Sequence, residues 1–387
     1  MSSKYEKVGV DARKKGIEVF ESTIENIFPN AFCTVGKDPD IEENGMVLHS
    51  DSAGSKPVQN YLQWRETEDL KWFKSIPQDV IAMNLDDILC VGAKPISFID
   101  YIAINKKRFP KKELLSVLNE GFREVFRSME KHGLGMSFLG GETADLPDQM
   151  KTIDVCGTLY GRVKLSDAIT GEDVEPGNLI VGLRSGGKAS YEDRKNSGIL
   201  CNGITLARHC LLKEEYEKKY PEIGSEKSKY YGKYSIEDSP KDLDMSIGEA
   251  IVSPTRIYAP IIHEMLEKLG EKITGLVHNT GGGQTKDLAI GKNIHYIKDG
   301  LFEPDPIFQL IKSESGESWR NMYEDYNMGS GFEVIVDKEH AKEVVEISKN
   351  YEVEAKVIGR CERNEKGNKV SVKSEFGKFV YEERDQN

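Results

Sequence analysis

Three short motifs in the first 145 residues carry side chains suited to binding a nucleoside triphosphate. They are Asp51-Ser-Ala-Gly54-Ser55-Lys56, Asn84-Leu-Asp-Asp87 and Gly140-Gly141-Glu142-Thr143-Ala-Asp145. Carboxylates are the hard oxygen ligands that Mg²⁺ takes, usually one or two beside water and substrate phosphates. Glycine lets backbone N–H groups approach phosphate oxygens, and lysine adds a positive charge. The three motifs, in this order, predict a site for ATP and Mg²⁺.

The first and third motifs are expected in loops at the ends of strands. Lys56 follows Gly54 after an apolar strand at Val47-Leu48, and its position beside Asp51 favours a phosphate contact over a surface lysine. Glu142 comes directly after a pair of glycines at the end of a strand, where α/β proteins commonly place ligand-binding groups. The alternative for Glu142 is a carboxylate in an ordinary turn.

The second motif lies on a predicted helix from Val80 to Leu89. Asn84 and Asp87 are three residues apart and share a face of that helix. An acid within an otherwise apolar segment needs a partner, which favours a metal ion or a phosphate-linked water over a solvated helix face. Asp86 is expected to be the solvent-facing neighbour of Asp87.

The second half of the chain offers one further candidate loop and one candidate helix start. The loop is His278-Asn-Thr280-Gly281-Gly282-Gly283, in which His278 closes a predicted strand. Three glycines indicate either close backbone approach to a ligand or a flexible turn, and a lone histidine is either catalytic or structural. Asn202-Gly203 precedes an apolar helix and is either an anion site or a helix cap.

One segment imitates a phosphate-binding loop without being one. Gly182-Leu-Arg-Ser-Gly-Gly-Lys188-Ala189 lacks the Ser or Thr that should follow the lysine, and a polar segment follows instead of a packed helix. No G-x-G-x-x-G follows a strand, so a Rossmann dinucleotide site is not expected.

Composition narrows the class of protein. A chain of 387 residues predicts two domains, which we place at 1–170 and 171–387. A net charge of −12 argues against nucleic acid or an anionic membrane as a general partner. No apolar run reaches the roughly 20 residues that span a bilayer, and the N-terminus does not resemble a secretory signal. The six cysteines form no C-x-x-C pair, which is typical of reduced thiols in a cytoplasmic protein.

Hydrophobic patterning predicts an α+β fold, an α/β sandwich. An apolar run at 96–104 indicates a buried strand, an amphipathic helix follows Pro110 and ends near Gly133, and strands are expected at 136–139 and 152–163. The second domain is predicted to contain strands at 179–183, 273–277, 332–336 and 354–360, with helices after Pro254 and over 338–349. Residues 213–244 show no apolar stripe and are expected to form an exposed charged insertion. The tail beyond about 363 is expected to be frayed.

These motifs resemble those of the phosphoribosylformylglycinamidine cyclo-ligases, the aminoimidazole ribonucleotide synthetases of purine biosynthesis. The resemblance runs from Tyr5 to about Glu362 and rests on Tyr5-x-x-x-Gly9-Val10-Asp11, Asp51-x-x-Gly54-Ser55-Lys56, Ala82-Met83-Asn84-x-x-Asp87 with Gly92-Ala93-x-Pro95, Phe98-Ile-Asp100-Tyr101, Gly140-Gly141-Glu142-Thr143-Ala144, Thr255-Arg256-Ile257-Tyr258, His278-x-Thr280-Gly281-Gly282-Gly283 and Asn327-Met328-Gly329.

The resemblance implies a reaction in which ATP phosphorylates the amide oxygen of formylglycinamidine ribonucleotide, after which a nitrogen closes the imidazole ring and phosphate leaves. It implies ATP contacts from Asp51, Gly54, Ser55, Lys56, Asn84, Asp87, Gly141, Glu142 and Thr143, with Asp51 and Asp87 at the metal. It also implies substrate contacts from Asn202, Gly203, Thr280, Gly281, Gly282 and Gly283, and catalytic roles for His278 (proton handling) and Lys56. The family fold implies a homodimer in which the N-terminal sheets pair into a barrel near ATP, joined to a C-terminal α/β domain.

The chain departs from the family pattern at several positions. In the first motif, Ser52 stands where the family has its first glycine. Before Asn202, Leu200-Cys201 replaces a His-Ser pair. These changes leave two alternatives open. One is another phosphoryl-transfer enzyme of the same superfamily, such as a thiamine-monophosphate kinase, and the other is a non-catalytic ATP-binding paralogue. A selenophosphate synthetase would need an early reactive cysteine, and a hydrogenase-maturation relative would end in one, whereas this chain ends Arg-Asp-Gln-Asn.

Overall fold

A computed structural model describes residues 3–10, 16–225 and 228–382. Asp11, which belongs to the opening motif, lies outside the described residues, as do the last five residues, 383–387. None of the helices within the described ranges is long and apolar enough to cross a membrane.

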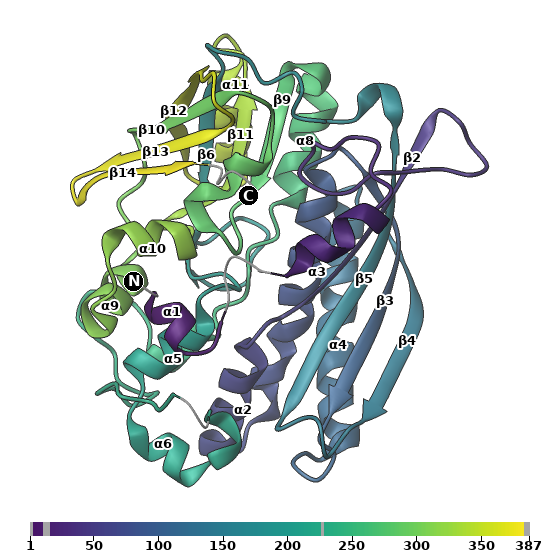
Figure 1. The fold of residues 1–387 in the computed structure, drawn as a ribbon. Coiled ribbons are helices and arrows are strands. Elements are labelled where there is room, and N and C mark those ends of the chain that lie inside the picture. The colour runs from purple at the N-terminus through teal and green to yellow at the C-terminus, as the bar shows by residue number, and fades with distance from the viewer. Residues whose placement is uncertain (1–2, 11–15, 226–227, 383–387) are drawn as a thin grey trace.

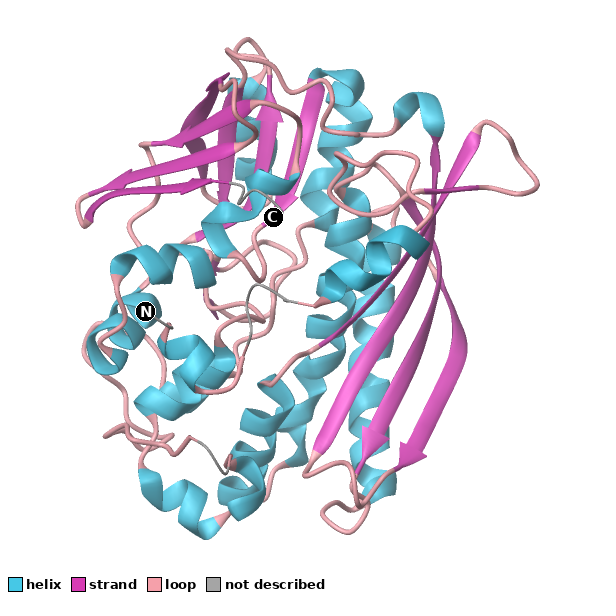
Figure 2. Ribbon diagram, viewed as in Figure 1, coloured by secondary structure: helices cyan, strands magenta, loops and turns pink. Residues whose placement is uncertain are grey.

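The first half of the chain forms a five-stranded sheet in the order β1-β2-β5-β3-β4. Helices α2, α3 and α4 lie on one side of this sheet, and its other side is bare (Figures 1 and 2). The elements are β1 (Gly36–Lys37), β2 (Asn44–Ser52), α2 (Lys56–Thr67), α3 (Ile76–Leu89), β3 (Lys94–Ile104), α4 (Lys111–Lys131), β4 (Ser137–Asp145) and β5 (Ile153–Lys164), after a short α1 (Lys4–Lys7). Within this sheet only β3 and β4 pair in parallel, and α4 is the crossover between them.

The sequence of α4 shows why a helix covers this sheet. Its apolar residues recur at helical spacing, so that one stripe faces the sheet while charged residues face solvent. Leu114, Leu118, Phe122, Val125 and Met129 are all buried. Phe122 stacks on Phe138 of β4 with ring centroids 5.8 Å apart.

The second half forms a seven-stranded sheet in the order β14-β13-β10-β12-β6-β11-β9. Its strands are β6 (Leu179–Arg184), β9 (Ile273–His278), β10 (Ile294–Lys298), β11 (Ser330–Val336), β12 (Ala355–Arg363), β13 (Lys369–Ser374) and β14 (Gly377–Glu382), and β7 (Gly186–Gly187) pairs with β8 (Asn196–Ser197) apart from it. The helices are α5 (Ile204–Leu211), α6 (Glu214–Lys219), α7 (Ile247–Ile251), α8 (Ala259–Leu269), α9 (Pro306–Ser315), α10 (Trp319–Asp325) and α11 (Ala341–Asn350).

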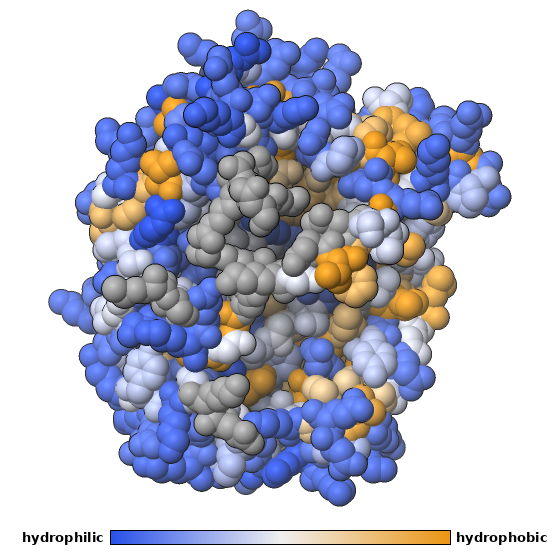
Figure 3. Space-filling model, viewed as in Figure 1, coloured by the Kyte–Doolittle hydropathy of each residue, from blue (hydrophilic) through white to orange (hydrophobic). Residues whose placement is uncertain are grey.

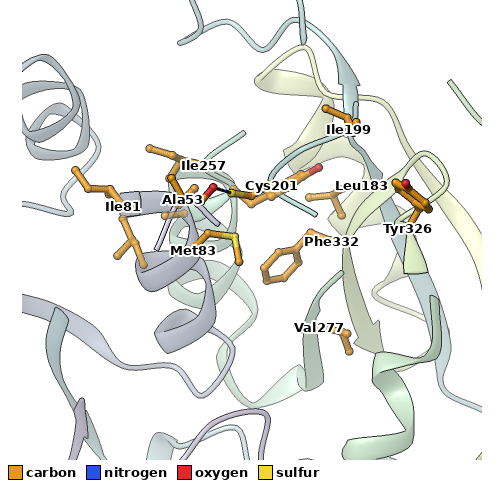
Figure 4. Close-up of a cluster of buried hydrophobic side chains, with 14 of the residues drawn as sticks. Ala53, Ile81, Met83, Leu183, Ile199, Cys201, Ile257, Val277, Tyr326 and Phe332 are labelled. Carbon is orange, nitrogen blue, oxygen red and sulfur yellow. Dashed lines mark hydrogen bonds between the residues drawn. The ribbon is translucent and has the colours of Figure 1, made fainter. Parts of the chain in front are cut away.

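The two halves share one apolar core (Figure 4). Figure 4 shows Ala53, Ile81 and Met83 from the first half meeting side chains of the second. Cys201 joins this contact, because its Sγ lies 3.1 Å from the backbone oxygen of Ala53. Burying apolar surface in this way stabilises the contact between the halves by about 25 cal/mol per Å². The first motif, at residues 51–56, and the second half of the chain therefore keep a fixed position relative to each other.

The α+β class with two sheet-containing domains is confirmed. The predicted strands and helices around 80–89, 96–104, 110–133, 152–163 and in the second domain all occur, with small shifts at their ends. The domain boundary at 170/171 stays a prediction, although the first sheet ends at Lys164 and the second begins at Leu179.

Three expectations about local structure were wrong. The tail beyond 363 is not frayed over its described part, because β13 and β14 form a hairpin at the edge of the second sheet. The insertion at 213–244 is not merely exposed, since Tyr220, Ile223, Tyr230, Ile236 and Leu243 are buried in its described residues. The strand expected at 136–139 continues through both glycines to Asp145.

Candidate active site

The carboxylate of Asp87 on α3 lies between two imidazole rings. Its Oδ1 accepts a hydrogen bond from Nδ1 of His278, the last residue of β9, at 2.7 Å. Its Oδ2 lies 3.3 Å from Nε2 of His49 on β2. His278 is fully buried, whereas 21% of the His49 side chain is exposed. One carboxylate thus joins the nucleotide-motif strand, the α3 helix and the glycine loop of the second domain.

The hydrogen bonds of Asn84 determine which nitrogen atoms of the His49 ring carry protons. The Asn84 Nδ2 donates to the backbone oxygens of Val80 at 2.8 Å and Asp51 at 3.2 Å. Its Oδ1 therefore accepts from Nδ1 of His49, 3.0 Å away. With Nδ1 protonated, Nε2 can donate to Asp87 only if the ring carries both protons. The arrangement favours an imidazolium at His49.

The local charges agree with that protonation state. Burial disfavours the charged form of His49, but the Asp87 carboxylate outweighs it and raises the pKa of His49. Burial likewise opposes ionisation of Asp87, yet the Lys286 ammonium and the hydrogen bonds from His278 and His49 hold its pKa below the usual range. Asp87 is therefore ionised and His49 is stabilised as a cation.

The prediction that Asp86 faces solvent was wrong. Asp86 is fully buried and accepts hydrogen bonds from the backbone N–H groups of Tyr258 (2.9 Å) and Ala259 (2.8 Å). These groups begin α8, where N–H groups have no partner within the helix. Burial raises the pKa of Asp86 to about 7. Adjacent acids on α3 thus hold different main partners, the start of α8 for Asp86 and the two histidines for Asp87, although Oδ2 of Asp86 also lies 3.9 Å from Nε2 of His278.

Lys56 begins α2 and points into the protein. Its ammonium is fully buried and lies 2.5 Å from Oδ1 of Asp79 and 2.7 Å from the backbone oxygen of Ser253. Asp79 also accepts hydrogen bonds from the N–H and the hydroxyl of Thr255. In this structure Lys56 therefore joins the nucleotide motif to the second domain, and its ammonium is engaged by protein oxygens.

The turn that follows β2 is built as a compact loop. Gly54 has φ +56°, a conformation that L-residues with side chains rarely adopt. The hydroxyl of Ser55 lies 2.8 Å from that of Thr205 on α5. Asp51 precedes this turn, and its Oδ1 accepts from the N–H of Ser52 at 2.7 Å.

The third motif, at 140–145, lies apart from the first two motifs in the structure. Asp51 pairs with Gly157 and Glu142 with Tyr101, and strand alternation places Asp51 on the face covered by helices and Glu142 on the bare face. Strand β4 is three strands from β2, which is roughly 14 Å. Among the described residues, no hydrogen bond or ion pair joins Gly141, Glu142 or Thr143 to the Asp87 cluster. Within a single chain, the third motif is therefore not in contact with the first two motifs.

The second-domain candidates do come together. The loop of Thr280–Gly283 follows His278, and a Cβ added at Gly281 would lie 3.4 Å from Oδ1 of Asn202. The Nδ2 of Asn202 is buried and has no hydrogen-bond partner among the described residues, as expected of a polar group that binds a ligand. Close packing explains why two of the predicted positions are glycine. A Cβ at Gly203 would overlap the Tyr326 ring, and a Cβ at Gly283 would overlap the backbone oxygen of Tyr326.

Sequence reasoning missed His49. The sequence pattern could have identified His49, because it lies two positions before Asp51 in the same predicted strand, and such residues point to the same face. The remaining donors fit a metal that is held largely by a nucleotide. Among the described residues no cluster of three or more His, Cys, Asp or Glu is arranged to hold a metal ion. Mg²⁺ usually takes only one or two carboxylates beside phosphates and water, so Asp51 and its neighbour Asp154 suit such a site.

Comparison with known proteins places both halves in one family. Residues 34–163 match the AIR synthase related protein N-terminal domain, and residues 175–371 match the C-terminal domain of the same family. The chain is 36% identical over 334 residues to a phosphoribosylformylglycinamidine cyclo-ligase of Methanococcus vannielii, covering 86% of this chain and 81% of the relative. A protein of the same name from Alkaliphilus metalliredigens is 28% identical, with 94% and 96% covered.

Solved structures share the fold at lower identity. The HypE–HypF complex aligns over 95% of this chain and 98% of its own with a TM-score of 0.53 and 16% identity. T. maritima PurL complexed with FGAR aligns over 94% of this chain and 48% of its own, with a TM-score of 0.55 and 13% identity. Because family models match both halves and relatives above 30% identity cover most of it, the chain belongs to the AIR synthase related family.

Proposed function

We propose that this chain catalyses the ATP-dependent cyclisation of formylglycinamidine ribonucleotide to aminoimidazole ribonucleotide, with release of ADP and phosphate. The observation that carries the proposal is the Asp87–His278 contact. It joins the helix that bears the second nucleotide motif to the glycine loop of the other domain. The curated relatives of the same family that bear the cyclo-ligase name support the same reaction.

The chemistry explains why ATP is consumed. An amide oxygen is a poor leaving group, so transfer of the γ-phosphoryl group to that oxygen makes the carbon open to attack. A nitrogen of the amidine side then forms the ring C–N bond and loses a proton, and the C–O bond breaks to release phosphate. The protein contributes chiefly by holding the two reactants and stabilising charge on the transferring group.

Each candidate residue receives a role within this reaction. Asp51 and Asp87 hold the nucleotide and its metal, Gly54 and Ser55 offer backbone and hydroxyl donors, and Asn84 orients His49. The loop of Thr280–Gly283 with Asn202 and Gly203 contacts the ribonucleotide. His278, whose Nε2 has no hydrogen-bond partner among the described residues and lies 3.9 Å from Oδ2 of Asp86, handles the proton released on ring closure.

Lys56 is assigned to positioning in this proposal. Its ammonium reaches Asp79 and Ser253 and so fixes the start of α2, where the nucleotide turn ends. Mg²⁺, when bound, would neutralise phosphate charge beside Asp51, with Asp87 and Asp154 as the other candidate carboxylates. A local cation is needed there, because the chain carries a net charge of −12 that repels anions.

A homodimer is part of the proposal. Large apolar side chains are exposed on the bare face of the first sheet, among them Leu48 (65%), Ile99 (43%), Tyr101 (43%) and Leu139 (68%). Figure 3 shows apolar surface at the edge where Figure 1 places β3 and β4. Contiguous exposed apolar surface marks interaction sites. Pairing of two such faces would cover it and would bring Glu142, Gly141 and Thr143 to the interface. We place the enzyme in the cytoplasm, where purine nucleotides are made.

The test is a parallel measurement of ADP and aminoimidazole ribonucleotide formed from magnesium–ATP, with and without formylglycinamidine ribonucleotide. Equal amounts of both products, formed only with substrate, are expected. ATP binding without substrate-dependent ADP release would contradict the proposal and favour a non-catalytic protein. ADP release without ring closure would point to a different phosphoryl acceptor.

A further inference from the structure

Arg208 on α5 is a buried cation with no carboxylate partner in the part of the chain that the structure describes. Only 4% of the residue is exposed. Its Nη1 donates to the hydroxyl of Tyr230 at 2.5 Å and to the backbone oxygen of Ile223 at 3.4 Å, and both acceptors are uncharged. Its Nε is buried with no hydrogen-bond partner, and no ion pair of Arg208 occurs in the described part of the chain. Burying a guanidinium is costly unless an anion compensates it.

Arg208 lines a pocket of about 490 Å³ beside the nucleotide turn. Ser52, Gly54 and Ser55 form one wall, and Thr205 of α5 stands next to Ser55. Lys151 adds a second cation at the rim, where its Nζ donates to the backbone oxygen of Gly224. The pocket therefore combines two cationic side chains, the hydroxyl groups of Ser52, Ser55 and Thr205, and a glycine turn.

Two acids also line this pocket, and neither of them neutralises Arg208. Glu222 receives hydrogen bonds from Tyr61 and Arg65 and lies 3.4 Å from Nη1 of Arg108, so its charge is already balanced. Burial raises the pKa of Asp154, which interacts with Ser52 and Asp51 and has no ion pair with Arg208 among the described residues. The remaining charge at the α5 wall is positive.

We propose that Arg208 and the hydroxyl-bearing wall of this pocket bind the phosphomonoester of the ribonucleotide substrate. This inference rests on the proposed function and names the group that anchors the substrate. A guanidinium presents a planar fork of N–H donors that matches phosphate oxygens in pairs. The unpartnered Nε supplies one prong of such a fork. The site lies beside the turn that the nucleotide motif forms, so that a substrate held by its phosphate extends toward the transferring phosphoryl group.

The competing reading is that Arg208 merely tethers the insertion to α5. A tether through Tyr230 and Ile223 explains the bonds of Nη1 but leaves Nε buried and unsatisfied. The two readings separate on Tyr230→Phe, which removes the best tether acceptor and keeps the guanidinium. A tether predicts similar defects in Tyr230→Phe and Arg208→Gln, whereas a phosphate site predicts a defect only in the second.

The first experiment is calorimetric titration of the full chain with ribose 5-phosphate and, in parallel, with ribose. We expect saturable binding of ribose 5-phosphate alone, weakened about 10- to 100-fold in Arg208→Gln and nearly unchanged in Tyr230→Phe. Arg208→Lys, which keeps the charge but not the fork, should fall between, and circular dichroism would verify that each variant folds. Equal binding in wild type and Arg208→Gln, equal defects in Arg208→Gln and Tyr230→Phe, or no saturable binding by the wild type, would each overturn the proposal.

The second experiment uses turnover and separates this proposal from the function itself. Arg208→Gln should raise the KM for formylglycinamidine ribonucleotide with little change in the KM for ATP, and should cause no further loss with the dephosphorylated substrate. A raised KM for ATP instead would assign Arg208 to the nucleotide phosphates and overturn the proposal. Absence of turnover with Arg208-dependent ribose 5-phosphate binding would reject the proposed reaction while supporting the phosphate site. Normal turnover in Arg208→Gln with an unchanged substrate KM would support the proposed reaction and reject the phosphate site.

Discussion

Asp87 and His278 are 191 residues apart in sequence and 2.7 Å apart in the structure. Their contact links the helix that carries the second motif to the end of β9, which leads into the glycine loop that we assign to the substrate. Since His49 lies against the other oxygen of the same carboxylate, changes at Asp87 affect both sides of the site.

Replacing Asp87 should remove nucleotide binding. In Asp87→Ala both imidazoles lose their carboxylate, and the metal loses a predicted ligand, so magnesium–ATP affinity should fall below detection in calorimetry. The fold should persist, as judged by a cooperative thermal transition. Asp244→Ala, which removes an exposed carboxylate paired with Lys195, serves as the control. Near-normal ATP affinity in Asp87→Ala would exclude Asp87 from the site.

His278→Ala should separate catalysis from binding. Loss of a proton-transfer group lowers turnover by about 10²- to 10⁴-fold, while ATP affinity should change only slightly because Asp87 and His49 remain. Steady-state kinetics beside calorimetric ATP titration would measure both. Unchanged turnover would return His278 to a purely structural role.

Asp86→Ala should act on stability. The change removes the acceptor of two N–H groups at the start of α8, leaving them buried without partners. We expect the free energy of unfolding to fall by about 1–3 kcal/mol, measured by urea denaturation. Asp167→Ala, at an exposed turn, is a suitable comparison. A loss no larger than that of the control would show that the helix start does not depend on Asp86.

Stability should depend on pH through His49 and Asp87. The pKa of His49 is raised in the folded state, so its contribution is complete below the unfolded value near 6.5 and declines as pH rises through the folded value. The pKa of Asp87 is lowered, so its contribution is present above about pH 4 and is lost as pH falls further. Between these limits the pair contributes fully.

The measurement is the difference in unfolding free energy between wild type and His49→Asn across pH 5 to 9. The difference should shrink toward high pH as the imidazolium deprotonates. A difference that stays constant over this range would mean that His49 does not carry the second proton.

Disrupting the bare face of the first sheet should dissociate the proposed dimer. Leu139→Lys places a charge among Leu48, Ile99 and Tyr101, where burial against a second copy would be unfavourable. Sedimentation velocity should show a shift from dimer to monomer. Val357→Lys introduces the same charge at a residue 42% exposed on the second sheet and should leave the dimer intact. A monomeric wild type would contradict the proposed pairing.

The amino-acid sequence determined the chemical inventory and the regular elements of this protein. The helical spacing of Asn84 and Asp87 predicted a shared face, and the stripe along α4 predicted a helix packed on a sheet. The order of motifs identified the family. These features are local, because periodicity and spacing act over a few residues.

Only the tertiary structure decided which charged groups are neutralised by the protein and which are left for ligands. Asp86 and Asp87 are neighbours in sequence, yet one caps α8 and the other binds two histidines. The sequence predicts Lys56 as a phosphate ligand, whereas in the structure its ammonium lies against Asp79; Arg208 carried no sequence signal, and only the structure shows that its buried Nε has no hydrogen-bond partner among the described residues. The physical reason is that the cost of burying a charge depends on its partners, and those partners come from distant segments of the chain.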